Sequence, residues 1–177
     1  MSRAINVLLV EDDPTHRTQI TQGLGKFGCV VRAFKDVATL AKADKKGFSE
    51  FSGKGRRVII LDIMLAFDLR DEDGPAIPWR EDGPPTAEEA KYYVDDDLGM
   101  KLAWDIRNGA YKHVPSDIPI LFLTARANEM IIEEIEQLSK GGRAKYLGKP
   151  AFSDEIHEAL RDLLAPDKHA GKGRRNE

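Results

Sequence analysis

Carboxylate, hydroxyl and ammonium side chains stand at the ends of apolar runs at several places in the chain. Glu11 and Asp12 follow the run at residues 5–10, and Asp62 interrupts the run at residues 57–65. Thr124 and Lys149 follow two later runs. If these residues met, three carboxylates would repel one another, and a hard divalent cation such as Mg²⁺ would relieve that repulsion. The hydroxyl and ammonium groups could then hold an anion, which is the equipment that phosphoryl transfer needs.

The apolar runs have the length and composition of buried strands. We expect strands at residues 5–10, 29–34, 57–65, 118–123 and 144–147. Helical periodicity lies between them, and the expected N-caps are Asp13, Asp36, Asp97 and Ser153. This alternation predicts an α/β fold with a doubly wound, five-stranded parallel sheet. Ligands bind at the carboxyl ends of the strands in such sheets, so the polar residues would share one edge.

The composition is that of one soluble domain, expected to cover residues 1–165. The 177 residues include 27 basic and 30 acidic ones, and the net charge of −3 argues against a nucleic-acid partner. The lone Cys29, expected to be a small buried residue, fits a reducing compartment. No apolar run is long enough to span a membrane, so we expect a cytoplasmic protein with no membrane partner. Residues 166–177 are basic and are expected to form a disordered tail.

Residues 66–97 interrupt the regular pattern and are interpreted as an acidic, proline-rich insertion between the third strand and the third helix. They hold eleven acidic and three basic residues, a net charge of −8. Thr86 and Glu89 have the spacing of a capping box, which predicts a short helix through Tyr93. The insertion is expected to be a lid or docking surface anchored by Trp79, Tyr92 and Tyr93, or else a solvated loop.

Four motifs in order resemble the receiver domains of two-component response regulators. They lie at residues 8–13 (LLVEDD), 60–65 (ILDIML), 122–125 (FLTA) and 146–150 (YLGKP). The resemblance covers residues 5 to 164 apart from the insertion, and it implies the flavodoxin-like (βα)5 receiver fold. Since few residues follow the last expected helix, a stand-alone receiver is expected.

The resemblance assigns roles to the acidic residues. Asp62 would be the phosphoacceptor, taking a phosphoryl group from a phosphohistidine. Asp12 would bind Mg²⁺ directly, Glu11 through water, and Asp62 would be a further ligand. The backbone carbonyl of Met64 would complete the protein ligands.

The resemblance also implies a switch. Thr124 and Lys149 would bind phosphoryl oxygens, and Tyr146 would turn inward as Thr124 moves, changing the surface of the fourth helix and fifth strand. The partners implied are a histidine kinase or histidine phosphotransfer protein and a downstream protein target, and a homodimer is compatible with the pattern. The chain would be no enzyme beyond self-catalysed phosphotransfer and slow autodephosphorylation.

Each of these residues also has a structural interpretation. Glu11 and Asp12 could cap a helix, and Asp62 could be a loop aspartate. Thr124 could be a strand residue, Lys149 a solvated lysine and Tyr146 an ordinary half-buried aromatic. Two other functions stay open: a pseudo-receiver that binds partners without phosphorylation, and a phosphatase with a strand-end aspartate nucleophile. Such phosphatases need a second aspartate where this chain has Met64.

Overall fold

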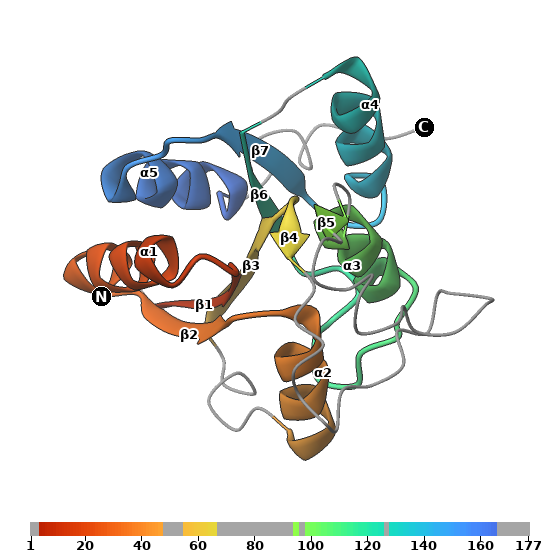
Figure 1. Cartoon of the computed structure of the whole chain (residues 1–177), viewed down its shortest axis with the longest axis horizontal. Coiled ribbons are helices and arrows are strands. Elements are labelled where there is room, and N and C mark those ends of the chain that lie inside the picture. The colour runs from red at the N-terminus through yellow and green to blue at the C-terminus, as the bar shows by residue number, and fades with distance from the viewer. Residues whose placement is uncertain (1–3, 48–54, 67–93, 96–97, 126–127, 166–177) are drawn as a thin grey trace, which may run out of the picture.

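Five parallel strands form the central sheet of the computed structural model, which describes residues 4–47, 55–66, 94–95, 98–125 and 128–165 (Figure 1). The strands are β1 (Ile5–Val10), β2 (Val30–Phe34), β3 (Arg56–Asp62), β6 (Ile120–Thr124) and β7 (Ala144–Gly148). They lie in the order β2-β1-β3-β6-β7. This order reverses between β1 and β3, which is the topological switch point of flavodoxin-like sheets. The predicted fold class is confirmed.

Helices cover both faces of the sheet. On one face α1 (Pro14–Lys26) and α5 (Ser153–Leu163) pack against β1, β3 and β6 through a core that includes Leu24 and Leu160. On the other face lie α2 (Val37–Lys46), α3 (Leu98–Arg107) and α4 (Glu129–Leu138). Figure 1 shows the two layers on opposite sides of the sheet. The alternation of strands and helices along the sequence therefore produces a sheet with a layer of helices on each face.

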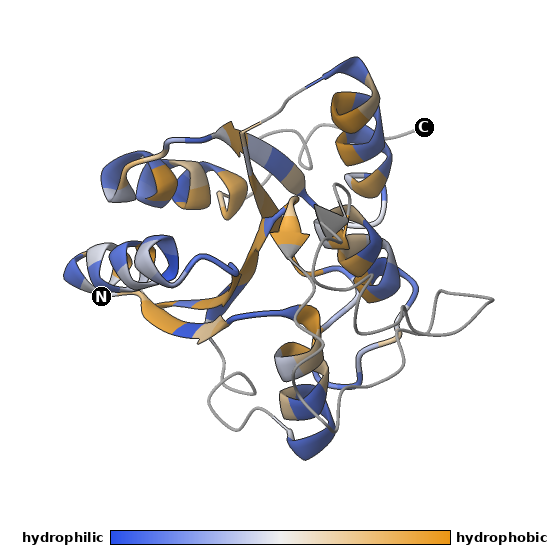
Figure 2. Cartoon of the chain, viewed as in Figure 1, coloured by the Kyte–Doolittle hydropathy of each residue, from blue (hydrophilic) through white to orange (hydrophobic). Residues whose placement is uncertain are grey.

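The inner strands are apolar through their central residues because both of their faces are buried there. Leu8 and Ile59 face one core, whereas Leu9 and Ile60 face the other. Figure 2 shows hydrophobic colour over much of these inner strands. Each such side chain contributes about 1.5–3 kcal/mol when fully buried. β1 and β3 pair in register, with Val10 opposite Leu61, so the polar residues at their ends emerge at the same edge of the sheet.

The start of α1 follows the prediction. The Asp13 carboxylate accepts hydrogen bonds from the backbone N–H groups of Thr15 at 2.7 Å and His16 at 2.8 Å, and Pro14 is the first helical residue. Asp36 likewise accepts from the Thr39 N–H at 2.6 Å and caps α2. Asp13 is thus occupied by the helix, which leaves Asp12 outside the cap.

The prediction that Ser153 caps the last helix is wrong. Ser153 is the first helical residue and Phe152 precedes it, with the Glu155 carboxylate accepting the Phe152 N–H at 2.8 Å. Ser153 instead packs against α1, where a Cβ added to Gly23 would lie 1.8 Å from the Ser153 Oγ. The Ser153 side chain therefore contributes to the close contact between α1 and α5 and does not cap the helix.

The expected single strand over residues 57–65 is also corrected. The parallel strand ends at Asp62, and β4 (Leu65–Ala66) pairs antiparallel with β5 (Val94–Asp95) in a separate two-stranded sheet. The Ile63 carbonyl accepts the Gly99 N–H at 3.0 Å, so α3 holds the chain at the point where it leaves the main sheet. The two ends of the insertion are thus joined beside the end of β3.

Several predictions fall outside the described residues. They are the Asp97 cap, the anchors Trp79, Tyr92 and Tyr93, the helix through Tyr93 and the character of residues 166–177. Among the helices that are described, none is both long and apolar enough to cross a membrane.

Candidate functional site

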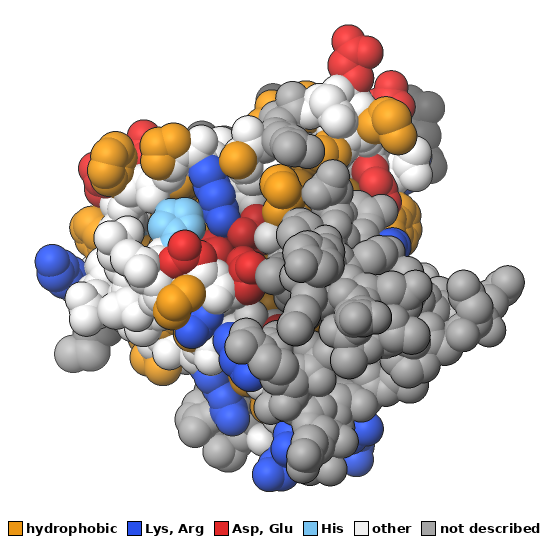
Figure 3. Space-filling view, in the orientation of Figure 1, with side chains coloured by type: hydrophobic (Ala, Val, Ile, Leu, Met, Phe, Trp, Pro, Cys, Tyr) orange, Lys and Arg blue, Asp and Glu red, His pale blue; other side chains and the backbone are white. Residues whose placement is uncertain are grey.

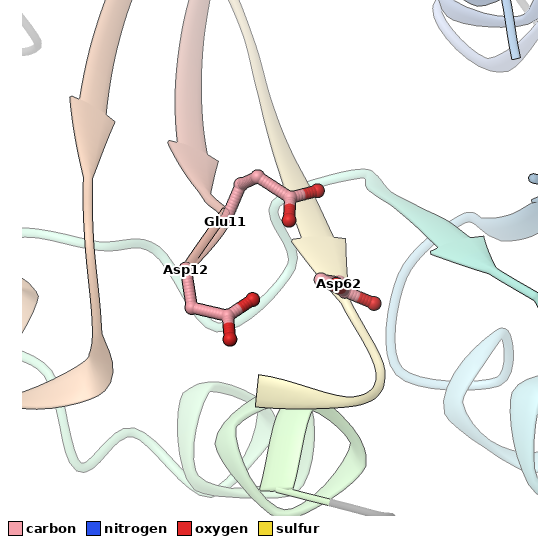
Figure 4. Close-up of side chains that lie close together, drawn as sticks. All are labelled: Glu11, Asp12 and Asp62. Carbon is pink, nitrogen blue, oxygen red and sulfur yellow. The ribbon is translucent and has the colours of Figure 1, made fainter. Parts of the chain in front are cut away.

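Three carboxylates meet at the carboxyl ends of β1 and β3. The two strands are parallel neighbours with Val10 opposite Leu61, so Glu11 and Asp62 follow at the same edge. Carboxylate oxygens of Glu11, Asp12 and Asp62 all lie within 4.8 Å of one another, and Figure 4 shows the three side chains gathered at this edge. Glu11 is 1% exposed and Asp62 is 5% exposed. The predicted meeting of these residues is confirmed.

Lys149 reaches the cluster from the loop after β7. Its Nζ lies 2.6 Å from Asp62 Oδ2 and 3.0 Å from Glu11 Oε2, and it donates a hydrogen bond to each. Its backbone N–H donates to the Thr124 carbonyl at 2.7 Å, which ties the loop to the end of β6. The lysine is therefore no solvated loop residue. In Figure 3, basic side chains and a histidine adjoin an acidic cluster on this face.

The charges of the site shift the pKa of Lys149 upward. Burial alone would lower this pKa, but the hydrogen bonds and negative charges of Asp62 and Glu11 outweigh burial and raise it. The ammonium group is consequently held in its charged form. It is a fixed cation beside Asp62.

The pKa of Glu11 is also raised. Burial is the largest cause and the negative charge of Asp62 is the next, while Lys149 and His16 only partly offset them. The Lys149 cation therefore leaves part of the carboxylate repulsion uncompensated. Further positive charge in the cluster would be favoured.

Backbone contacts orient the acids. The Met64 N–H donates to Asp62 Oδ1 at 3.1 Å, so one carboxylate oxygen faces the backbone and the other faces Lys149. Arg17 on α1 donates to the carbonyls of Glu11 at 2.7 Å and Asp12 at 3.0 Å. These bonds fix the loop after β1, from which both acids project.

The donor set suits a hard divalent cation. Glu11, Asp12 and Asp62 offer only carboxylate oxygens, which Mg²⁺ and Ca²⁺ prefer over the nitrogen and sulfur ligands of softer metals. The residues present thus fit the cation that the sequence motifs imply. The choice between the two ions depends on ligand number and rigidity.

The structure adds a residue that the sequence interpretation missed. His16 Nδ1 lies 3.3 Å from Glu11 Oε2, on the first turn of α1. No spacing rule in the sequence relates the two residues, because their approach depends on the angle at which α1 leaves β1. The histidine forms the α1 side of the site.

The remaining predicted residues occupy different places. Thr124 ends β6 and is 1% exposed, opposite Gly148 in the register of β7. Tyr146 on β7 is 42% exposed, so the structure does not bury its side chain in the core. Met64 lies next to Asp62, where its N–H makes the contact given above. The roles proposed for Thr124, Tyr146 and the Met64 carbonyl stay predictions.

Solved structures share this fold, whereas no family model and no curated protein matches the sequence. A putative response regulator from Chloroflexus aurantiacus J-10-fl is 18% identical with a TM-score of 0.57, over 94% of this chain and 100% of that chain. Vibrio cholerae chemotaxis protein CheY4 is 21% identical with a TM-score of 0.55, over 91% of this chain and 99% of that chain.

A third similar structure is a response regulator from Burkholderia pseudomallei with a phosphorylated aspartic acid, a calcium ion and citrate. It is 21% identical with a TM-score of 0.52, over 88% of this chain and 65% of that chain. The strand order and the five covering helices are those of CheY-like receiver domains. The chain therefore has the fold of response-regulator receivers.

Proposed function

We propose that this chain is a phosphorelay receiver that accepts a phosphoryl group on Asp62 from a phosphohistidine donor in the presence of Mg²⁺. The observation that carries the proposal is the position of Asp62 Oδ2, 2.6 Å from Lys149 Nζ and beside the carboxylates of Glu11 and Asp12. The receiver fold of the similar structures supports the same function. The partners would be a histidine kinase or histidine phosphotransfer protein and a downstream target protein.

The transfer step forms one bond and breaks one. A carboxylate oxygen of Asp62 attacks phosphorus, the P–N bond to the donor imidazole breaks, and that nitrogen keeps the bonding electron pair. A bound Mg²⁺ would neutralise the charge of the carboxylates and phosphoryl oxygens. Lys149, freed from part of its pairing with Asp62, would bind a phosphoryl oxygen, and the Thr124 hydroxyl would donate to another. The product is an acyl phosphate on Asp62.

The new charge would act as a switch. A phosphoryl group adds about −1.5 to −2 charge at the sheet edge. Lys149 is linked through its N–H to Thr124, and Thr124 is paired in register with the end of β7. Movement of these two residues would therefore displace the end of β7, and Tyr146 on β7 would turn inward. Binding of the target would select the phosphorylated conformation.

Incubation with a small phosphodonor and Mg²⁺ tests the proposal, with intact-mass spectrometry as the readout. We expect a phosphorylated adduct with the wild-type chain, loss of the adduct with Asp62→Asn, and retention with Asp154→Asn on the exposed first turn of α5. Persistent modification of Asp62→Asn would overturn the assignment of the acceptor.

A pseudo-receiver would give a different result in the same assay. It would remain unmodified with every small phosphodonor. Beryllofluoride with Mg²⁺ would leave its amide NMR spectrum unchanged. The acids and the lysine that phosphorylation needs are together in this structure, which favours the phosphoaccepting function. In either case the chain would not turn over a substrate as an enzyme does.

A further inference from the structure

A groove of about 600 Å³ runs between α4, β7 and α5, away from the carboxylate site. Figure 1 shows α4 and α5 on opposite sides of β7. The apolar surface of the groove comes partly from Ile132 of α4, Leu147 of β7 and Ala159 of α5. Among the described strands only β6 pairs with β7, so one edge of β7 faces this groove. Such an edge offers backbone groups to an added extended segment.

The groove is acidic. Its charged lining residues are Lys145 and the four acids Glu136, Glu155, Glu158 and Asp162, a net charge of −3. Lys145 Nζ lies 3.6 Å from Asp162 Oδ2, an exposed pair that neutralises only one of the four acids. The lining therefore favours an occupant with several positive charges and long aliphatic stems that can lie on the apolar surface.

A basic segment of the same chain begins at one end of this groove. The Ala165 carbonyl accepts a hydrogen bond from Arg143, which immediately precedes β7, and the Leu164 carbonyl accepts one from Arg56 at 3.0 Å. The first bond fastens the end of α5 beside the start of β7, and the second fastens it beside the start of β3. Ala165, the last residue that the structure describes, is thus held next to the acidic lining.

We propose that residues 166–177 dock in this groove, extended along the free edge of β7. The segment carries Lys168, Lys172, Arg174 and Arg175 against two acids, a net charge of +2. Twelve extended residues reach up to about 40 Å, and the five-residue β7 is only about 17 Å long. The tether gives an effective concentration in the millimolar range, so a weak contact suffices for occupancy. The docked segment covers Tyr146.

This docking is tested on the unphosphorylated protein, so its failure and the failure of the proposed function are distinguishable. The full chain carries a nitroxide on Asn176→Cys, and paramagnetic broadening of backbone amides is measured by NMR. Burial raises the pKa of the native Cys29 thiol, which leaves the added cysteine as the reactive one. We expect broadening at Ile132 and Glu136 on α4 and at Tyr146 on β7, beyond the residues near Ala165 that any tethered label would broaden.

Charge variants decide whether the groove is responsible. The double variant Glu136→Lys with Glu158→Lys reverses two charges of the groove and should abolish the broadening on α4. The double variant Arg174→Glu with Arg175→Glu changes only the segment and should abolish the same broadening. Combining both pairs should restore it. Glu133→Lys, on the same helix but outside the groove, should leave it unchanged.

Three outcomes would overturn the proposal. They are no broadening on α4 in the wild-type sequence, equal broadening in the groove and control variants, or broadening that arises only between labelled and unlabelled copies in a mixture. The last would assign the groove to a second copy of the chain.

Discussion

Gly99, the second residue of α3, packs its backbone directly against the carbonyl of Asp62. A Cβ atom added to Gly99 would lie 2.0 Å from the Asp62 oxygen and 2.8 Å from the Ile63 Cα. The Gly99 N–H also donates to the Ile63 carbonyl at 3.0 Å. The start of α3 thus sets the backbone position of Asp62, although residues 66–97 separate them in sequence. This contact predicts that a methyl group at residue 99 disturbs the acceptor.

Gly99→Ala should destabilise the fold by about 1–3 kcal/mol, because backbone must move to admit the Cβ. It should also slow modification of Asp62 by a small phosphodonor. Gly25→Ala on α1 is the matched control, since a Cβ there meets nothing within 4 Å, and it should stabilise by about 0.5–1 kcal/mol. Urea unfolding of both variants checks the pair, and equal stabilities would contradict the contact.

Glu11→Gln should stabilise the metal-free protein at neutral pH by on the order of 1 kcal/mol, the usual size of such a gain. The folded-state pKa of Glu11 is raised above its ordinary value of 4.5, so folding favours the neutral acid. Ionisation penalises the fold fully above the raised pKa, and the penalty disappears as pH falls below 4.5. Thermal melts from neutral to acid pH should therefore show the advantage of the variant shrinking. A constant advantage would point to a cause other than charge.

Mg²⁺ should raise the thermal stability of the wild-type chain. Binding to the folded state alone contributes about 2.7 kcal/mol when the free ion is at 100 times its Kd. Asp12→Asn should remove most of this gain, because it takes away one of the three carboxylates that converge within 4.8 Å. Melting curves with Mg²⁺ and with EDTA check the result, and Asp154→Asn serves as the control. Equal gains for Asp12→Asn and wild type would exclude Asp12 as a ligand.

Asp44→Asn should cost about 1–3 kcal/mol, far from the carboxylate site. The buried Asp44 carboxylate accepts the backbone N–H groups of Lys112 at 2.8 Å and His113 at 2.7 Å. The amide of asparagine can accept only one of them and presents its NH₂ to the other. Glu133→Gln on exposed α4 should change stability by less than about 0.5 kcal/mol. Denaturant midpoints for the two variants would contradict the prediction if they coincided.

The order of elements and the main site residues could be predicted from the sequence. Strands buried on both faces must be continuously apolar, so a single acid at the end of such a run, as at Asp62, is conspicuous. Parallel pairing then brings strand ends to one edge, which is why the meeting of Glu11, Asp12, Asp62 and Lys149 followed from local patterns. The Asp13 and Asp36 caps are equally local, since each depends on residues two or three positions away.

Only the tertiary structure decided the contacts that depend on how elements approach in space. The packing of Gly99 on Asp62, of Ser153 on Gly23 and of His16 on Glu11 depends on helix placement, which no periodicity encodes. The same holds for the end of β3 at Asp62 and the pairing of β4 with β5. An apolar run indicates that a segment is buried, but its long-range pairing partners determine where the strand ends. The sequence therefore specified which groups could do the chemistry, and the packing of α1, α3 and α5 specified how those groups are held.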